Sequence, residues 1–428
     1  MLTRRRLLGA AAATAGAGAA GGLAGCDPDP AGPAGLDPGD WRSVRDQFRL
    51  DRGVAHLAAF VFASHPAPVR DAIDRHRAGL DADPTGYLRT HEGKAEDAVL
   101  AAAAGYLAAK PEHVAFTDST TMGLGLLYTG LALAPGDEIL TTEHDFFATH
   151  EALRLRSERD GAAVRRVRLY DRPAAANVAG AVRAVLAGLT PKTRVLALTW
   201  VHSSTGVRLP VREIVDAVRG RAGDRVLICV DGVHGLGAVD ATPAALGADF
   251  LVAGTHKWLF GPRGTGVVCG SEAGWARYTP VIPTFDPRAF DAWMGGQGPP
   301  LPPGAGATPG GYHSFEHRWA LAEAFRFAST LGRARVARRV ADLASALKAG
   351  LRGIAGVTVH TPAAPELSAG IVCCEVAGVA PYDAVTRLRA AKVVASVTPY
   401  AEGLLRFGPS IVNDEADVDR ALAAVKDL

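Results

Sequence analysis

Polar side chains that can act together in chemistry follow three apolar runs of the sequence. One run, VLICV, ends at Asp231, and a second, FLVAG, is followed after one residue by His256 and Lys257. A third run, VAF, leads into a hydroxyl-rich turn that contains Thr120 and Thr121. A carboxylate and an amine held beside a helix amino terminus can bind a cationic ring, a carbonyl group and an anion at the same time.

Pyridoxal phosphate combines a cationic ring, an aldehyde and a phosphate. The amine of Lys257 can condense with the aldehyde as a Schiff base, because an amine in a site that disfavours its charge loses its proton readily. The carboxylate of Asp231 can keep the pyridine nitrogen protonated, so that the ring withdraws electrons from the substrate. The turn Ser119-Thr120-Thr121 offers backbone N–H groups and hydroxyls to the phosphate. The residues therefore predict a site for pyridoxal 5'-phosphate.

The elements that must hold these groups alternate along the chain. The 428 residues, 48% hydrophobic and 21% charged, suffice for one large or two ordinary domains and exclude global disorder. We expect strands at residues 114–116, 138–141, 164–169, 195–199, 226–230, 250–253 and 266–269, and helices at 121–133, 146–160, 178–189 and 211–221. Strands that are apolar on both faces and separated by helices predict an α/β fold with a mostly parallel sheet between helical layers. Ligands bind such sheets beyond the carboxyl ends of the strands.

A stretch rich in Pro and Gly, residues 295–311, divides this region from the rest of the chain. We expect it to be a long loop or hinge. Residues 316–350 then have helical periodicity, and short strands and helices follow, which predicts a smaller carboxyl-terminal α/β domain. The expected domains are an export signal (1–26), a tether (27–50), a large cofactor-binding domain (51–311) and a small domain (312–428).

The amino terminus resembles an export signal. Arg4, Arg5 and Arg6 precede an Ala/Gly/Leu run without acidic residues, a layout similar to twin-arginine signals. The sequence LAGC ending at Cys26 resembles a lipobox, in which the cysteine carries a lipid. We expect twin-arginine export to the periplasm or cell surface, with the membrane contacted only through a lipid on Cys26; the alternative is a cytoplasmic protein with an Ala/Gly tail. The formal net charge is +2 and no basic cluster is evident, so we expect no nucleic-acid partner.

The other cysteines and the histidines predict neither disulfides nor a metal site. The four remaining cysteines all lie in apolar, strand-like runs: Cys229, Cys269, Cys373 and Cys374. Buried free thiols are the expected state. Two histidine pairs lack a carboxylate or cysteine that would complete a metal site: His144 with His150, and His313 with His317.

The stretch DGVHGLG that begins at Asp231, together with GTHKWLFGPRGTG (254–266), resembles the class V aminotransferase family of fold-type I pyridoxal-phosphate enzymes. Relatives in this family include cysteine desulfurases, selenocysteine lyases and isopenicillin N epimerase-like proteins. The likeness covers roughly residues 54–428. It implies the fold-type I transferase fold and a homodimer with its active site at the interface.

The resemblance also implies a role for each matching residue. Lys257 matches the Schiff-base lysine, and Asp231 matches the partner of the pyridine nitrogen. The remaining matches are Thr120 and Thr121 in the phosphate turn, His144 stacked on the cofactor ring (Phe146 or Phe147 if the register differs), His234 near the ring hydroxyl, His256 on the phosphate, and Arg406 on the substrate carboxylate.

The sequence departs from the family pattern at three places. Ser203 stands where relatives commonly have Asn, and Gly254 where they often have Ser or Thr. The Gly-Thr that relatives contribute to the neighbouring subunit's phosphate is replaced by Gly311-Tyr312 or displaced to Thr308. These changes affect the substrate side more than cofactor binding.

The residues leave several reactions open on an amino acid or related amine. Cysteine desulfurases need an exposed, activated cysteine, whereas Cys373 and Cys374 lie in a strand-like run. We therefore favour an aminotransferase over an isopenicillin N epimerase-like racemase or a C–S lyase or desulfurase-like enzyme. A non-enzymatic binding lipoprotein is the remaining alternative, and an intact Lys257 and Asp231 argue against it.

Overall fold

The computed structural model describes residues 35–428, so the expected export signal and residues 27–34 of the expected tether lie outside the described residues. A seven-stranded sheet forms the centre, in the order β2-β8-β7-β6-β5-β3-β4. Its strands are β2 (Val114–Thr117), β3 (Glu138–Thr142), β4 (Ala163–Val167), β5 (Thr193–Thr199), β6 (Leu227–Asp231), β7 (Phe250–Gly254) and β8 (Gly266–Gly270). Only β8 runs antiparallel to its neighbours. The predicted mostly parallel sheet is confirmed.

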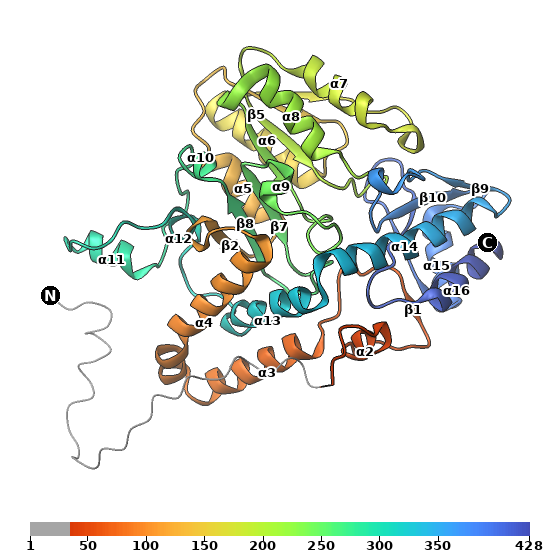
Figure 1. Cartoon of the computed structure of the whole chain (residues 1–428), viewed down its shortest axis with the longest axis horizontal. Coiled ribbons are helices and arrows are strands. Elements are labelled where there is room, and N and C mark those ends of the chain that lie inside the picture. Colours follow the sequence, from red (N-terminus) through yellow and green to blue (C-terminus); the bar gives the residue numbers. More distant parts are fainter. Residues whose placement is uncertain (1–34) are drawn as a thin grey trace.

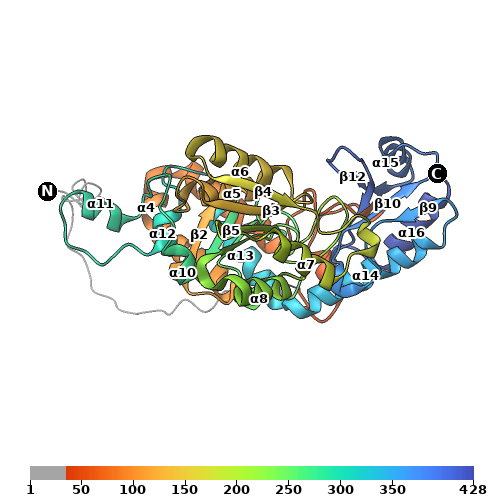
Figure 2. The same ribbon diagram turned by 90° about the horizontal axis from the view of Figure 1, so that it is seen from above.

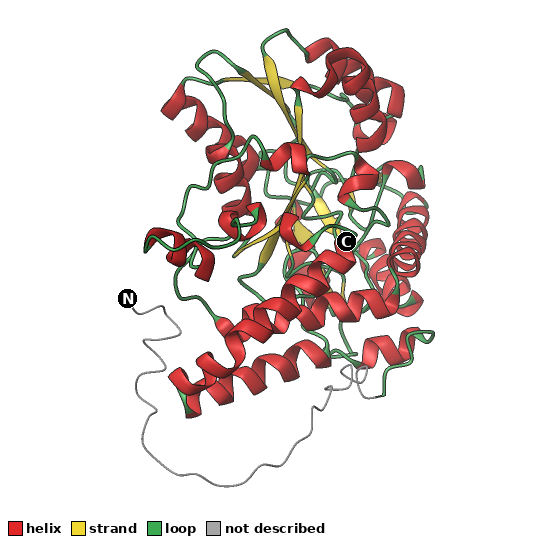
Figure 3. Ribbon diagram, turned by 60° about the vertical axis from the view of Figure 1, so that its left-hand side comes forward, coloured by secondary structure: helices red, strands yellow, loops and turns green. Residues whose placement is uncertain are grey.

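Helices cover both faces of this sheet, as Figures 1 and 3 show. Residues alternate between the faces along each strand. In β6, Leu227 and Cys229 pack with α5 (Thr120–Gly130) and α6 (Phe147–Asp160). Ile228 and Val230 belong to the other face's core. That face is covered by α3 (Ala67–Ala82), α4 (Pro84–Leu107), α7 (Val178–Gly188), α8 (Val211–Ala222), α9 (Pro243–Leu246) and α13 (Phe315–Leu331).

Two segments differ from the sequence-based prediction. The Pro/Gly-rich stretch is not entirely loop, because it contains α12 (Pro303–Ala307), whose first residue is a proline that loses no hydrogen bond there. The helical region 316–350 is two helices, α13 and α14 (Arg333–Arg352), because Gly332 adopts φ +78° between them. Two further short helices lie near this stretch: α10 (Glu272–Trp275) and α11 (Pro287–Trp293). Short 3₁₀ turns occupy 111–113, 173–175, 223–225 and 365–367.

A second, antiparallel sheet follows α14, at the opposite end of the molecule from α11 (Figure 2). Its order is β12 (Ser396–Val397), β13 (Leu405–Phe407), β10 (Val372–Val376) and β9 (Val357–Val359). The helices α14, α15 (Pro381–Ala390) and α16 (Glu415–Lys426) pack against it. A short parallel pair, β1 (Ala55–His56) with β11 (Val393–Val394), joins it to the amino-terminal part of the described chain.

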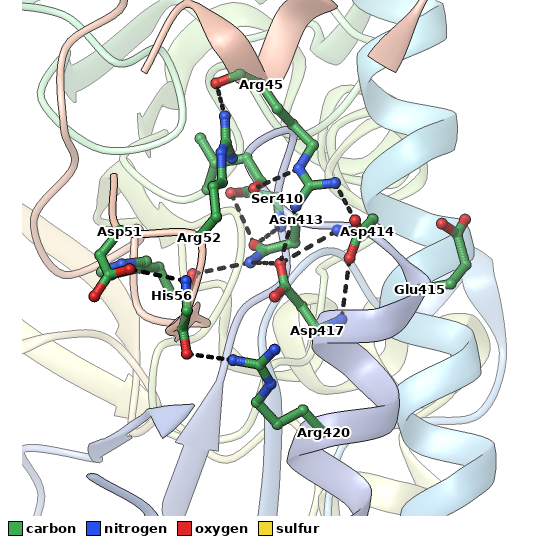
Figure 4. A network of polar contacts seen from close by, with 12 residues as sticks. Arg45, Asp51, Arg52, His56, Ser410, Asn413, Asp414, Glu415, Asp417 and Arg420 are labelled. Carbon is green, nitrogen blue, oxygen red and sulfur yellow. Dashed lines mark hydrogen bonds and ion pairs between the residues drawn. The ribbon is translucent and has the colours of Figure 1, made fainter. Parts of the chain in front are cut away.

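Residues 41–50, which the sequence analysis assigns to the tether, pack onto the rest of the protein. They include α2 (Trp41–Asp46), and Val44 and Phe48 are buried in the main core. Figure 4 shows the polar network that attaches this segment to the start of α16. Arg45 pairs with Asp414, while the amide of Asn413 donates to the His56 carbonyl (3.3 Å) and to Asp417 (3.0 Å). Among residues 35–428, no helix is long and apolar enough to cross a bilayer.

Candidate active site

The strand order places the predicted site residues along one edge of the sheet. Asp231 is the last residue of β6. On one side of β6 lies β7, whose carboxyl end leads to Lys257; on the other side lies β5, which leads to Ser203, and beyond it β3, which leads to His144. Asp231 therefore lies between the lysine and the residues that follow β5 and β3. This is the edge at which parallel sheets bind their ligands.

The environment of Lys257 favours the neutral form of its amine. Burial lowers its pKa to about 8, although Asp231 opposes the shift, and Arg406 lowers it further. Trp258 Nε1 donates to His234 Nδ1 at 3.3 Å, and His234 Nε2 lies 3.4 Å from Lys257 Nζ. Burial holds the pKa of His234 well below its usual value, so this ring is neutral. Since the indole N–H can only donate, the single imidazole proton is on Nε2, where it can donate to the neutral form of the amine.

Asp231 is a buried carboxylate without an ion-pair partner among residues 35–428. Its side chain is 1% exposed, and Oδ1 accepts a hydrogen bond from the Val233 N–H at 3.0 Å. Burial raises its pKa to about 6, against the lowering effects of that hydrogen bond and of Lys257. A cationic group bound against this carboxylate offsets the cost of burying its charge. The protonated nitrogen of a pyridine ring is such a group.

The hydroxyl-rich turn forms the amino terminus of α5. Ser119 caps the helix by accepting from the Met122 N–H at 3.1 Å, and the first backbone N–H groups of the helix have no partner within it. The Thr120 hydroxyl accepts from the Gly254 N–H at 2.7 Å. A Cβ at Gly254 would lie 3.1 Å from Thr120 Oγ1 and 3.0 Å from the His256 ring. Close packing here accounts for glycine at the position where relatives often have Ser or Thr.

His256 adds an unpaired polar atom to this corner. Its Nδ1 is buried without a hydrogen-bond partner in the described part of the chain. Buried polar atoms of proteins nearly always have a partner, so this nitrogen is available to bind a group at this corner. Thr120, Thr121 and His256 together offer an anion a helix amino terminus, hydroxyls and a ring nitrogen.

His144 lies beside two residues that the sequence analysis did not identify. Its ring stacks on Tyr170, with centroids 3.9 Å apart and planes 11° apart, and its Nε2 accepts from the Leu169 N–H at 3.2 Å. The Tyr170 hydroxyl lies 2.8 Å from Nδ1 of the fully buried His202. Burial lowers the pKa of His202 to about 3, and its Nε2 has no partner among residues 35–428. Of the two residues named for a shifted register, Phe146 is half-buried and Phe147 is exposed.

Arg406 extends from β13 toward the large sheet. Its guanidinium donates to the Ser203 carbonyl (3.0 Å), to Ser396 Oγ (3.0 Å) and to the Val397 carbonyl (3.5 Å), and lies 4.7 Å from the centre of the Phe60 ring. A guanidinium has five N–H donors, so one remains on each terminal nitrogen. Two such donors suit a carboxylate.

Ser203, Thr308 and Tyr312, where the sequence differs from the family pattern, each have defined surroundings in the structure. Ser203 Oγ lies 2.8 Å from the hydroxyl of Tyr400, which the sequence analysis did not identify. No local pattern could have found this contact, because the two residues are 197 positions apart. Thr308 uses its hydroxyl within its own chain, accepting from the Phe116 N–H and donating to the Gly304 carbonyl, and Tyr312 is exposed.

The residues at this edge fit pyridoxal phosphate. An amine of lowered pKa, a buried carboxylate without an ion pair among residues 35–428 and an anion-binding corner with an unpaired ring nitrogen converge there. Among residues 35–428 no group of three or more His, Cys, Asp or Glu side chains is arranged to hold a metal ion.

Comparisons with known proteins identify the family of the chain. Residues 90–420 match the family model described as aminotransferase class-V. The chain is 28% identical over 404 residues to isopenicillin N epimerase of Amycolatopsis lactamdurans, covering 91% of this chain and 98% of that protein. It is 25% identical over 402 residues to isopenicillin N epimerase of Streptomyces clavuligerus, with the same coverage.

Solved structures show the same fold. The cystine C–S lyase C-DES superposes with a TM-score of 0.80 at 20% identity, covering 88% of this chain and 98% of the lyase. A cysteine desulfurase from Escherichia coli superposes with a TM-score of 0.75 at 20% identity, covering 91% and 98%. The fold is therefore the fold-type I transferase fold, as predicted. The chain belongs to the class V aminotransferase family, whose cofactor is pyridoxal 5'-phosphate.

Proposed function

We propose that this protein is a racemase or epimerase that inverts the α-carbon of an amino acid or a related amine bearing a carboxylate. Lys257, beside His234 and the buried Asp231, can move the Cα proton, a step that inversion and amino-group transfer share. The observation that carries the proposal of inversion is therefore the match to known relatives. The similarity to two isopenicillin N epimerases over nearly their whole length favours inversion among the reactions of the family.

Each residue has a physical task in this proposal. Bound pyridoxal phosphate supplies an electron sink that acidifies the Cα–H bond. Lys257 Nζ exchanges a proton with the α-carbon, and Asp231 holds the pyridine nitrogen. The other roles are those that the family resemblance implies. Thr120, Thr121 and His256 bind the phosphate, and His144 packs against the cofactor ring with Phe146 next to it. His234 orients the lysine, and Arg406 binds the substrate carboxylate.

Sulfur transfer has no support from the described cysteines. Cys373 and Cys374 have no exposed surface, and burial raises the pKa of both thiols to about 12. Burial also raises the pKa of Cys269 to about 12 and that of Cys229 well above its usual value. A persulfide-forming cysteine requires an accessible thiolate.

Transfer of the amino group, which the sequence analysis favours, uses the same lysine and carboxylate. One experiment separates the two reactions. The holoenzyme is incubated with single enantiomers of amino acids while the products are separated on a chiral column and the cofactor absorbance is recorded. Appearance of the other enantiomer with an unchanged cofactor supports inversion, whereas conversion of the cofactor to its pyridoxamine form shows transfer and refutes the proposal.

We also propose that the enzyme is a homodimer. Large apolar side chains are exposed around α11: Val281, Ile282, Phe285, Trp293, Leu301 and Tyr312. An exposed apolar group of this extent is typical of a protein–protein interface. The active site at the subunit interface that the family resemblance implies agrees with this assignment.

We further propose that the protein is exported folded, with its cofactor, through the twin-arginine route and anchored by a lipid on Cys26. The support is the layout of residues 1–26. Replacing Arg5 and Arg6 together by Lys is expected to retain the protein in the cytoplasm, and Cys26→Ala to release it from the membrane fraction. Unchanged fractionation of both variants would refute export and anchoring.

A further inference from the structure

Tyr400 lies where the small sheet meets the large one. Tyr400 belongs to the loop between β12 and β13. Thr398 closes this loop, because the Thr398 N–H donates to the Leu404 carbonyl (2.9 Å) and the Thr398 hydroxyl accepts from the Leu404 N–H (2.8 Å). The Tyr400 hydroxyl lies 2.8 Å from the Oγ of Ser203, a residue of the large-sheet region that follows the end of β5. Its ring meets Phe146, next to the start of α6, edge-on at 6.1 Å.

These contacts place Tyr400 and Lys257 on opposite sides of Asp231 along the sheet edge. Tyr400 contacts residues that follow β5 and β3, and Lys257 follows β7, while Asp231 ends β6 between them. Both side chains lie within electrostatic reach of Asp231 and of Arg406. A substrate bound near Asp231 and Arg406 would thus have the amine of Lys257 on its β7 side and the phenol of Tyr400 on its β5 side.

Two proton-transferring groups on opposite sides suit inversion of a carbon centre, because one can take the proton from one side while the other delivers a proton from the other side. We propose that Tyr400 is the second proton-transferring residue of this enzyme and acts on the face of the α-carbon opposite to Lys257. This inference rests on the proposed racemase or epimerase function.

The step balances without another reactant. Lys257 Nζ takes the Cα proton while the electron pair of the C–H bond stays with the substrate. The O–H bond of Tyr400 breaks, and its proton forms the new C–H bond on the other side. An ammonium on Lys257 and a phenolate on Tyr400 remain. Lys257 then loses one proton to water, and Tyr400 gains one proton from water through the Ser203 hydroxyl. Both groups thereby return to their starting states.

Other groups on the same side are less suited to this task. His144 Nε2 accepts from the Leu169 N–H, and the Tyr170 hydroxyl is shared between His202 and Thr205. Tyr400 has one side-chain partner, Ser203, through which its phenol can exchange protons. Burial raises the pKa of Tyr400 to about 12, while the bond with Ser203 and the charge of Arg406 oppose the shift, so the phenol is protonated and can donate at neutral pH.

The test compares Tyr400→Phe with Tyr382→Phe, a matched change at a small-domain tyrosine that is 74% exposed. Both holoenzymes receive single enantiomers of the substrate in D₂O, and inversion and Cα deuterium incorporation are measured separately. In Tyr400→Phe we expect inversion to fall about 100-fold or more, while Lys257 still exchanges the Cα proton of one enantiomer with retention. Tyr382→Phe is expected to match the wild type in both measurements.

Cofactor absorbance provides a readout that does not depend on turnover. We expect Tyr400→Phe to bind the cofactor with wild-type affinity and absorbance, because the phenol acts on the substrate. A loss of cofactor binding assigns Tyr400 a structural role and overturns the inference, as does inversion within a few-fold of wild type. Absence of inversion by the wild-type enzyme refutes the proposed function itself, and the role of Tyr400 with it.

Discussion

At the scale of single residues, the chain uses burial and a fixed imidazole tautomer to prepare Lys257. The indole N–H of Trp258 fixes the proton of His234 on the nitrogen that faces the amine. Burial of the amine and the charge of Arg406 then favour the neutral form, which is the nucleophilic one.

This arrangement predicts a pH dependence for cofactor uptake by the cofactor-free protein. The pKa of Lys257 is lowered to about 8, so the neutral fraction rises about tenfold per pH unit below that value and levels off above it. Stopped-flow absorbance of pyridoxal phosphate binding between pH 6 and 10 should follow this curve. A rate that keeps rising to pH 10 would show an ordinary, solvated lysine.

At Gly254 we expect the residue type that relatives often have to weaken cofactor binding in this chain. Gly254→Ser introduces the residue type that relatives often have, but its Cβ would press on Thr120 Oγ1 and on His256. We expect a several-fold weaker affinity for the cofactor, measured by equilibrium titration. Gly93→Ser, in α4 with no atom within 4 Å of the added Cβ, is the control. An affinity equal to that of the control would contradict the crowding.

Motif spacing predicted Lys257, Asp231 and the turn at Thr120 because these residues follow apolar runs that are local in sequence. It did not predict Tyr400 or Tyr170. Their partners lie far away in the chain, and a single tyrosine in a loop carries no periodic pattern.

At the scale of elements, the sheet order determines the site. The sequence predicts the strands from their apolar runs and β-branched residues, and most bounds agree closely with the structure. The order of the strands depends on tertiary packing, which local patterns do not contain. That order places Asp231 between Lys257 on one side and Ser203 on the other.

The network in Figure 4 makes a prediction about stability. Asn413 has no exposed surface; its Oδ1 accepts from the Ser410 N–H, and its Nδ2 donates to His56 and Asp417. Asn413→Ala leaves buried groups without partners, so we expect the free energy of unfolding to fall by about 1–3 kcal/mol in denaturant titrations.

The control for this prediction is Asp419→Ala, at an exposed position of α16, with an expected change within about 0.5 kcal/mol. Equal effects of the two substitutions would show that the network contributes little to attaching residues 41–56.

At the scale of the whole molecule, the exposed apolar side chains around α11 lie at the end opposite to the small sheet (Figure 2). Trp293 is 83% exposed, and we expect Trp293→Asp to shift the protein from dimer to monomer in light scattering, because burying a carboxylate in the interface is costly. Tyr382→Asp, at an exposed position of the small-sheet region, is expected to remain dimeric. A monomeric wild type would contradict the proposed interface.

The central claim is that Lys257 forms the covalent link to pyridoxal phosphate. Lys348 provides an internal comparison: it is also buried with a pKa lowered to about 8, but its amine donates to Ser368 and to the carbonyls of Pro362 and Ala363. Borohydride reduction of the holoenzyme followed by peptide mass mapping tests the claim directly. The predicted result is a reduced pyridoxyl adduct on Lys257 and none on Lys348; an unmodified Lys257 in cofactor-saturated protein would contradict it.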